Sequence, residues 1–188
     1  MDDEREDEQT MVPLPERFWS FETDGLIESC LICGGHLLGE EAPYLIEKAF
    51  SKGEVVFEYG LCLGCHGDLV RELSEASLER IRNHFVEQVH FEARRQRIAA
   101  GLDGTADPWL SHCLLTGQPI NPGGEYQIFG MCLGDRLMLG DLPHALSGEA
   151  IGRLMELLSP ETRGFLNDFT GKYFGAPTGA DLPTLLPV

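Results

Sequence analysis

The sequence has 188 residues, 43% of them hydrophobic, and a formal net charge of −17 at pH 7. This length and composition predict one domain or two small ones with modest cores. No apolar run reaches the length of a membrane-spanning helix, so the sequence argues against a membrane protein. The negative charge repels phosphate backbones, which makes nucleic acid an unfavourable partner.

The beginning of the chain, "MDDEREDEQT", has the opposite charge from a secretory signal peptide. It predicts a disordered acidic tail over residues 1–10, because nothing in it is apolar enough to be buried. We therefore expect a cytoplasmic protein whose thiols stay reduced. In that compartment the six cysteines of the sequence indicate metal ligands rather than disulfide bonds.

An extended lead-in is expected over residues 11–28, held to the core by the aromatic side chains of Phe18, Trp19 and Phe21. Residues 29–100 then read as one module with a long C-terminal helix. Its segment 44–62, "YLIEKAFSKGEVVFEYGLC", has two β-rich runs around a turn containing glycine, which predicts a hairpin. Ser77 is a candidate cap for the long helix, which is expected to continue to Ala99 or Ala100.

Two CxxC pairs flank the predicted hairpin, Cys30 with Cys33 and Cys62 with Cys65. A CxxC turn presents two sulfurs to one ion, and two such turns complete a tetrahedral shell of four thiolates, which suits zinc. The glycines that follow Cys33 allow the backbone to fold beneath a metal. The sequence therefore predicts one structural zinc ion held by these four cysteines.

Two other chemistries share part of this pattern. Cys62, Cys65 and His66 match the haem-attachment motif CxxCH, but haem attachment leaves Cys30 and Cys33 without a role. A redox dithiol is expected at a helix start within a βαβ unit, a context that the sequence does not suggest. His66 is then most simply a residue at the helix start beside the metal, with a catalytic or ligand role as the alternative.

The order of knuckle, hairpin and helix over residues 28–75 resembles the treble-clef and zinc-ribbon-like group of four-cysteine zinc-binding folds. A degraded form of the same pattern covers residues 111–140. The resemblance implies an α+β fold. It says little about function, because that group includes ribosomal proteins, nucleases and protein-binding modules.

Residues 111–175 look like a second, degenerate treble-clef-like module, joined to the first by a linker over residues 101–110. "CLLTGQ" repeats "CLICGG", "EYQIFGMCLGD" repeats "VVFEYGLCLGC", and amphipathic helical patterns follow both. Ser159 and Pro160 predict a helix start, and Gly175 predicts a stop. The tail over residues 176–188 is rich in Gly and Pro and is expected to be irregular. The sequence thus predicts two tandem modules.

Aligning the two copies suggests what became of the metal site. The second copy has Thr116 where the first has Cys33, and Thr is a poor zinc ligand. The simplest interpretation is therefore a vestigial site, in which the sulfurs of Cys113 and Cys132 are expected roughly 4–6 Å apart by zinc–thiolate geometry. A rebuilt metal site with His112 or His144 and a redox-active pair of cysteines are the alternatives. The alignment places Cys113 on Cys30, Thr116 on Cys33, Cys132 on Cys62, Asp135 on Cys65 and Phe129 on Tyr59.

These patterns favour a non-enzymatic, zinc-stabilised adaptor or regulatory protein that binds an unknown protein partner. A homodimer through the amphipathic helices is a further expectation. The first alternative is a metal-dependent hydrolase or nuclease with a site near His66 or near Cys113, Cys132 and Asp135. The second is a nucleic-acid-binding regulator that uses the basic run Arg94, Arg95 and Arg97.

Overall fold

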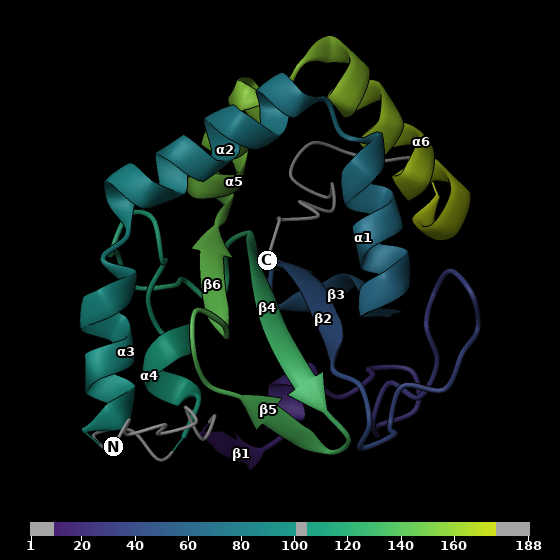
Figure 1. Cartoon of the computed structure of the whole chain (residues 1–188), viewed down its shortest axis with the longest axis vertical. Helices are drawn as coiled ribbons and strands as arrows, with labels where there is room; N and C mark the ends of the chain where they lie inside the picture. The colour runs from purple at the N-terminus through teal and green to yellow at the C-terminus, as the bar shows by residue number, and fades with distance from the viewer. Residues whose placement is uncertain (1–9, 101–104, 176–188) are drawn as a thin grey trace, which may run out of the picture.

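The computed structural model describes residues 10–100 and 105–175, which form a mixed α/β fold with one antiparallel sheet and six α-helices (Figure 1). Residues 1–9 of the predicted acidic tail 1–10, the predicted tail 176–188 and part of the predicted linker, 101–104, lie outside the described residues. No helix within the described ranges is long and apolar enough to cross a membrane. The strands are β1 (Met11–Pro13), β2 (Tyr44–Ser51), β3 (Glu54–Cys62), β4 (Tyr126–Leu133), β5 (Arg136–Met138) and β6 (His144–Ser147). The helices are α1 (Leu63–Glu72), α2 (Glu75–Gln88), α3 (Phe91–Ala99), α4 (Asp107–Leu110), α5 (Gly148–Leu157) and α6 (Pro160–Phe174), with a 3-10 turn at Glu16–Phe18.

β2 and β4 lie side by side at the centre of the sheet and run antiparallel (Figure 1). β3 pairs with the outer edge of β2. The outer edge of β4 is shared by β6 and β5, and β1 extends the sheet beyond β5. β3 and β6 therefore occupy matching places on the two sides of the central pair.

The register of these strands repeats on the two sides. Tyr44 at the start of β2 lies opposite Cys62 of β3, and Tyr126 at the start of β4 lies opposite Ser147 of β6. Across the centre, Tyr44 is opposite Cys132 and Tyr126 is opposite Phe50. The two central tyrosines thus have equivalent positions in the ladder.

The hairpin predicted over residues 44–62 is confirmed. β2 and β3 are joined by Lys52 and Gly53, whose φ angles are 55° and 82°. Two consecutive residues with positive φ match the tight turn that fits the twist of a two-stranded ribbon, and glycine reaches that conformation without steric cost.

Serine residues begin the two long helices. Ser159 caps α6 with Pro160 in its first turn, and α6 ends at Gly175, as predicted. The cap of α2 is Ser74, however, and the predicted cap Ser77 lies three residues inside the helix. The single long helix predicted to Ala99 or Ala100 is also divided, because Val89 leaves the helical conformation between α2 and α3.

The starts of α2 and α6 hold each other through their backbone N–H groups. Ser74 N–H donates to Thr162 Oγ1 at 2.9 Å, and Ser159 N–H donates to Ser77 Oγ at 2.8 Å. The hydroxyls of Ser74 and Ser159 lie 3.0 Å apart between them. In an ordinary capping box the third helical residue bonds back to its own cap. Here Ser77, the third residue of α2, caps α6, and Thr162, the third residue of α6, caps α2.

Each long helix covers the strand from the other half of the sequence. The Phe85 ring of α2 lies 6.4 Å from the His144 ring of β6, and the Phe169 ring of α6 lies 6.1 Å from the Tyr59 ring of β3. Figure 1 shows these helices arching along one side of the sheet. These ring contacts bury one face of each helix inside the chain, and the homodimer expected through the amphipathic helices stays a prediction.

The face of the sheet opposite these helices is covered by the N-terminal segment, the chain between β1 and β2, which includes Phe18 and Leu37. A Cβ on Gly130 would lie 2.9 Å from the Phe18 ring, and one on Gly60 would lie 2.6 Å from a methyl carbon of Leu37. These two glycines therefore allow the segment to approach the strands closely. The predicted anchoring of the lead-in is confirmed for Phe18, which is fully buried, and for Trp19, which packs partly buried against the core, but it is wrong for Phe21, which is 75% exposed.

Tyr59 and His144 have different polar surroundings although they lie at matching places. The Tyr59 hydroxyl donates to the buried carboxylate of Glu47, which lies opposite it on β2. His144 lies opposite Phe129, and neither of its ring nitrogens has a partner with normal hydrogen-bond geometry. The predicted equivalence of Tyr59 and Phe129 is therefore wrong, because Phe129 matches Glu47 across the central pair.

The exchanged caps should contribute measurably to stability. Ser77→Ala leaves the Ser159 N–H without its partner, and Thr162→Val does the same to the Ser74 N–H. Each substitution should lower the free energy of unfolding by about 1–3 kcal/mol, the cost of an unsatisfied buried donor. Urea unfolding followed by circular dichroism measures this. Glu79→Ala on the exposed side of α2 is the control, and equal effects of all three would contradict the reciprocal caps.

Stability should fall in mild acid through His144. Burial first, and then the charge of Arg94, lower its pKa to about 3, while the Asp141 carboxylate acts in the opposite direction. Below about pH 6.5 the unfolded chain takes up a proton that the folded chain refuses, so this residue costs about 2 kcal/mol at pH 5 relative to pH 8. Urea unfolding of His144→Leu at both pH values should show this loss removed. Exposed His90→Gln should leave the loss unchanged, and an unaltered pH dependence in His144→Leu would contradict the assignment.

Candidate metal centre

The structure brings together the four cysteines that the sequence singles out. One sulfur each from Cys30, Cys33, Cys62 and Cys65 lies within 4.8 Å of all the others, and the sulfurs of Cys33 and Cys62 are 4.0 Å apart. In a tetrahedral zinc–thiolate site, bonds of about 2.3 Å place the sulfurs about 3.8 Å apart. The cluster is therefore within metal-binding distance and fits a four-thiolate ion such as zinc.

The first pair is presented by a tight backbone loop. Gly34 N–H donates to the Cys30 carbonyl at 2.9 Å, and Cys30 N–H donates to the Gly35 carbonyl at 2.8 Å. Gly34 has a φ of 68°, a conformation that favours glycine. Leu31 N–H donates to the Gly60 carbonyl at 2.9 Å, which attaches this loop to β3. The loop and the end of β3 are thereby fixed side by side.

The second pair is presented by the start of α1. Cys62 is the N-cap of α1, and its sulfur accepts the Cys65 N–H at 3.5 Å. Free N–H groups at a helix start favour negative charge, including that of a thiolate. The end of a strand and the first turn of a helix thus direct the two sulfurs toward the loop that carries Cys30 and Cys33.

The thiols of the cluster differ in acidity. Burial would raise the pKa of Cys30, but N–H groups of Cys33, Cys62 and Ile32 outweigh it and lower that pKa to about 7. Burial, followed by hydrogen bonding with the neighbouring thiols, raises the pKa of Cys65. Four thiols at this spacing cannot all ionise without a compensating positive charge, which a metal cation supplies.

The alternatives for Cys62 and Cys65 fit this arrangement less well. Their sulfurs converge on the other pair, an arrangement that haem attachment does not require and that suits one small ion. His66 follows Cys65 in α1, is buried, and does not belong to the sulfur cluster.

A second loop of the same form surrounds Cys113. Gly117 N–H donates to the Cys113 carbonyl and Cys113 N–H donates to the Gln118 carbonyl, both at 2.8 Å, and Gly117 has a φ of 66°. Leu114 N–H donates to the Ala145 carbonyl of β6 at 2.8 Å. The Cys113 loop therefore attaches to β6 as the Cys30 loop attaches to β3.

The predicted proximity of Cys113 and Cys132 is wrong. Cys113 bridges to Ala145, and Ala145 lies opposite Ile128 on β4. Cys132 lies four residues beyond Ile128, which places it roughly 13 Å farther along the strand at about 3.3 Å per residue. Cys132 is fully buried beside the Tyr44 hydroxyl, and burial raises its pKa to about 12.

The second metal site suggested by the sequence does not form. Among the described residues, Cys30, Cys33, Cys62 and Cys65 are the one group of three or more possible ligands close enough to share an ion. Asp135 lies in the turn between β4 and β5, and His112 is exposed beside Ser111. The residues next to Cys113 are instead Thr116 and Ser147.

Ser147 was missed because it carries no metal-ligand signature. The sequence alignment followed the spelling shared by "FGMCLGD" and "YGLCLGC", which placed Cys132 on Cys62. A spacing signal was nevertheless present. Cys62 and Ser74 cap successive helices in the first half, and Ser147 and Ser159 cap successive helices at the same separation in the second half.

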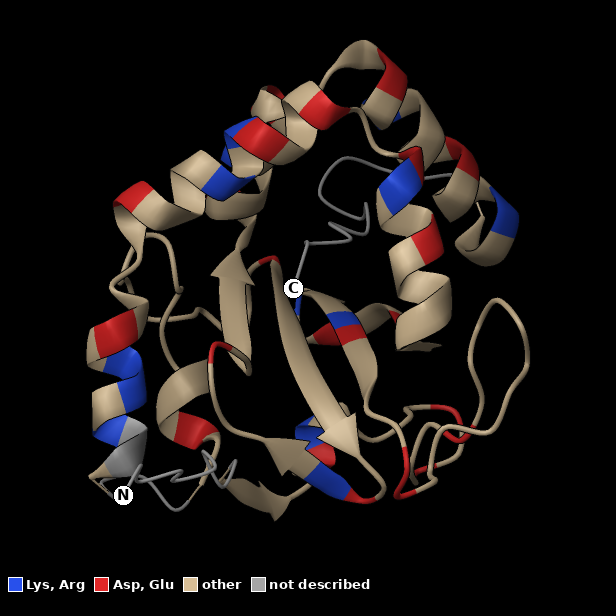
Figure 2. Cartoon of the chain, in the orientation of Figure 1, with Lys and Arg blue, Asp and Glu red and all other residues tan. Residues whose placement is uncertain are grey.

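The basic run on α3 is engaged within the chain. The Arg94 and Arg97 guanidinium groups lie 4.3 and 5.5 Å from the centre of the Trp109 ring. Arg95 pairs with Asp141 at 2.9 Å. Figure 2 shows acidic and basic residues together on α2, whereas basic residues predominate on α3. Arg94 is buried and packs α3 against Trp109, whereas Arg95 and Arg97 are exposed.

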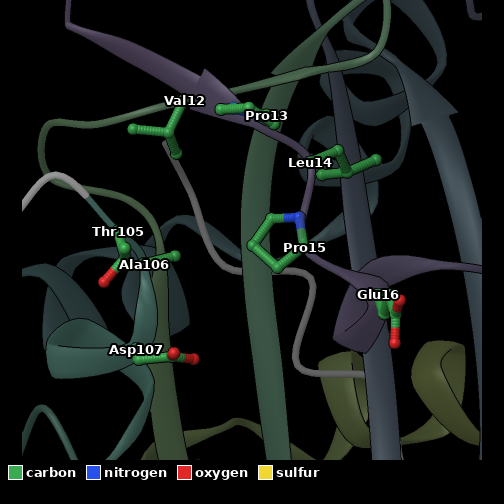
Figure 3. A pocket seen from close by; sticks show the side chains of 8 residues that line it. All are labelled: Val12, Pro13, Leu14, Pro15, Glu16, Thr105, Ala106 and Asp107. Atoms are coloured by element: carbon green, nitrogen blue, oxygen red, sulfur yellow. The ribbon is translucent and has the colours of Figure 1, made fainter.

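A shallow pocket of about 350 Å³ lies away from the sulfur cluster, between residues 12–16 and residues 105–107 (Figure 3). Its lining has no Cys or His, and its two carboxylates, Glu16 and Asp107, lie on opposite sides in Figure 3. The pocket therefore offers two carboxylates but no thiol or imidazole.

The cluster predicts that metal binding needs Cys33 and Cys65 and does not need Cys132. Cys33→Ser or Cys65→Ser should remove most of the bound metal and lower the free energy of unfolding by several kcal/mol, because metal-binding free energy there is folding free energy. Native mass spectrometry and thermal unfolding measure the two effects. Cys132→Ala removes a buried thiol outside the cluster and should keep one metal per chain. Normal metal content in Cys33→Ser would refute the assignment.

No protein-family model matches the chain, and neither a curated protein nor a solved structure matches it. The feature that agrees with the predicted resemblance is the group of four cysteines within metal-binding distance, next to an antiparallel hairpin and a helix start. These cysteines are consistent with a zinc-binding group.

Proposed function

We propose that this chain is a non-enzymatic, zinc-stabilised protein that acts by binding a protein partner, as an adaptor or regulator. One zinc ion is held by Cys30, Cys33, Cys62 and Cys65. The observation that carries the proposal is that all four sulfurs lie within 4.8 Å of one another. A reducing compartment such as the cytoplasm would keep these thiols available for the metal.

Four thiolates leave a zinc ion no free coordination position. Structural zinc sites are closed in this way, whereas hydrolytic zinc has three protein ligands and one water molecule. The alternative of a metal-dependent hydrolase or nuclease would therefore need a second ion elsewhere in the chain. Two metal equivalents in the purified wild-type protein would favour that alternative over the one proposed here.

We also propose that residues 29–100 and 111–175 descend from one duplicated module. Three features support this. The loops at Cys30 and Cys113 have the same backbone hydrogen bonds. The strand registers repeat about the pairing of β2 with β4. Each half contains two successive capped helices, the first of ten residues in both cases. The first module keeps its metal and the second does not.

The surface that suits a partner is the end of the first module that carries the metal. Ile32 and Leu63 adjoin Cys33 and Cys62, whose sulfurs are 4.0 Å apart, so these side chains flank the same end. Ile32 is 36% exposed and Leu63 is 39% exposed, which leaves two large apolar side chains partly in water. A rigid metal-bound loop presents them at little cost in conformational entropy.

Partner capture from a native extract tests this function. The double variant Ile32→Asp with Leu63→Asp should lose a protein that the wild type retains, because charge opposes burial of this surface. Val86→Asp, at an exposed apolar residue of α2, should retain it. Metal content is measured for every variant, so that loss of the ion is not mistaken for loss of binding. Capture that is unaffected by the double variant would overturn the proposed surface.

A further inference from the structure

We infer that the second module's counterparts of the four metal ligands are Cys113, Thr116, Ser147 and Ala150. Hydrogen bonds to the Cys113 sulfur hold this site together without a metal. The inference rests on the duplication in the proposed function. It differs from the sequence alignment at two of the four places, where Ser147 and Ala150 stand instead of Cys132 and Asp135.

The strand bridges fix the position of Ser147. Cys30 forms a parallel bridge with Gly60, and Cys113 forms a parallel bridge with Ala145. Cys62 lies two residues after Gly60, and Ser147 lies two residues after Ala145. Side chains two residues apart on a strand point to the same face, so Ser147 occupies the place of Cys62.

The helix starts fix the position of Ala150. Cys62 caps the ten-residue helix α1, and its side chain accepts the Cys65 N–H. Ser147 caps the ten-residue helix α5, and its side chain accepts the Ala150 N–H. Ala150 therefore stands where Cys65 stands in the first module. It is 1% exposed, so its methyl group is packed in the interior.

The contacts of the two buried sulfurs also correspond. The Cys30 sulfur accepts N–H groups of Cys33 and Cys62. The Cys113 sulfur accepts backbone N–H groups of Thr116 and Ser147, the latter at 3.4 Å.

In addition, the hydroxyls of Thr116 and Ser147 bond to the Cys113 sulfur, the latter at 3.5 Å. These donors satisfy the sulfur from the side where the first module has thiols. The second loop is thus closed by two hydroxyls and a methyl group in place of three thiolates and an ion.

The decisive experiment restores the missing ligands. The triple variant Thr116→Cys, Ser147→Cys and Ala150→Cys, with native Cys113, should bind two zinc or cobalt ions per chain where the wild type binds one. Cobalt should give the absorption of a tetrahedral thiolate site at about twice the wild-type amplitude. A folded triple variant that binds one ion would overturn the inference.

The matched control restores the ligands that the sequence alignment suggests. Thr116→Cys with Asp135→Cys, together with native Cys113 and Cys132, also offers four thiols but should bind one ion. A second ion in this control and not in the triple variant would favour the sequence alignment. A wild-type chain with no metal would instead refute the proposed function, so the two failures are distinguishable.

A single substitution tests the same site if the triple variant does not fold. The thiol introduced by Ser147→Cys should lie against the Cys113 sulfur and form a disulfide with it under a mild diamide oxidant, which is reduced as the two thiols lose their protons and electrons. Peptide mapping by mass spectrometry identifies the bond. Asp135→Cys should form no disulfide with Cys113. The reverse pattern would overturn the inference.

Discussion

β2 and β4 pair along nearly their whole lengths, from Tyr44 opposite Cys132 to Phe50 opposite Tyr126, and this contact joins two ribbons that are far apart in the sequence. At its midpoint Glu47 lies opposite Phe129, and the buried Glu47 carboxylate accepts a hydrogen bond from Tyr59. The pairing also sets where β3 and β6 lie, and through them where both cysteine loops attach.

The central pairing makes the exchange of helices possible. β3 and β6 lie on opposite sides of the central pair of strands. α2 therefore crosses the sheet to cover His144 of β6, and α6 crosses in the other direction to cover Tyr59 of β3. Ser74 and Ser159 meet where the two helices start. Thr162 accepts the Ser74 N–H, and Ser77 accepts the Ser159 N–H. Neither half buries its own strands alone, so we expect the halves to unfold as one cooperative unit.

The two cysteine loops show two ways of closing the same backbone turn. The first presents four thiols that an ion can neutralise; Cys30 is buried, and the other three cysteines are partly or largely exposed. The second buries Cys113 and surrounds its sulfur with hydroxyl and N–H donors. A metal site contributes far more folding free energy than a few weak hydrogen bonds to sulfur. The second loop compensates by being more deeply packed, with Cys113 and Ala150 each 1% exposed.

The sequence by itself determined the features that depend on local spacing: the group of four cysteines, the hairpin at Lys52 and Gly53, and the helix bounded by Ser159 and Gly175. It did not determine the counterpart of Cys62. The segment "FGMCLGD" resembles the first motif in sequence, whereas the place of Ser147 is fixed by the pairing of β6 with β4 and by the bridge between Cys113 and Ala145. Strand pairing between distant segments depends on how side chains pack across the whole sheet, and no local pattern encodes that packing. The tertiary structure alone therefore decided which residues face Cys113 and which strand each long helix covers.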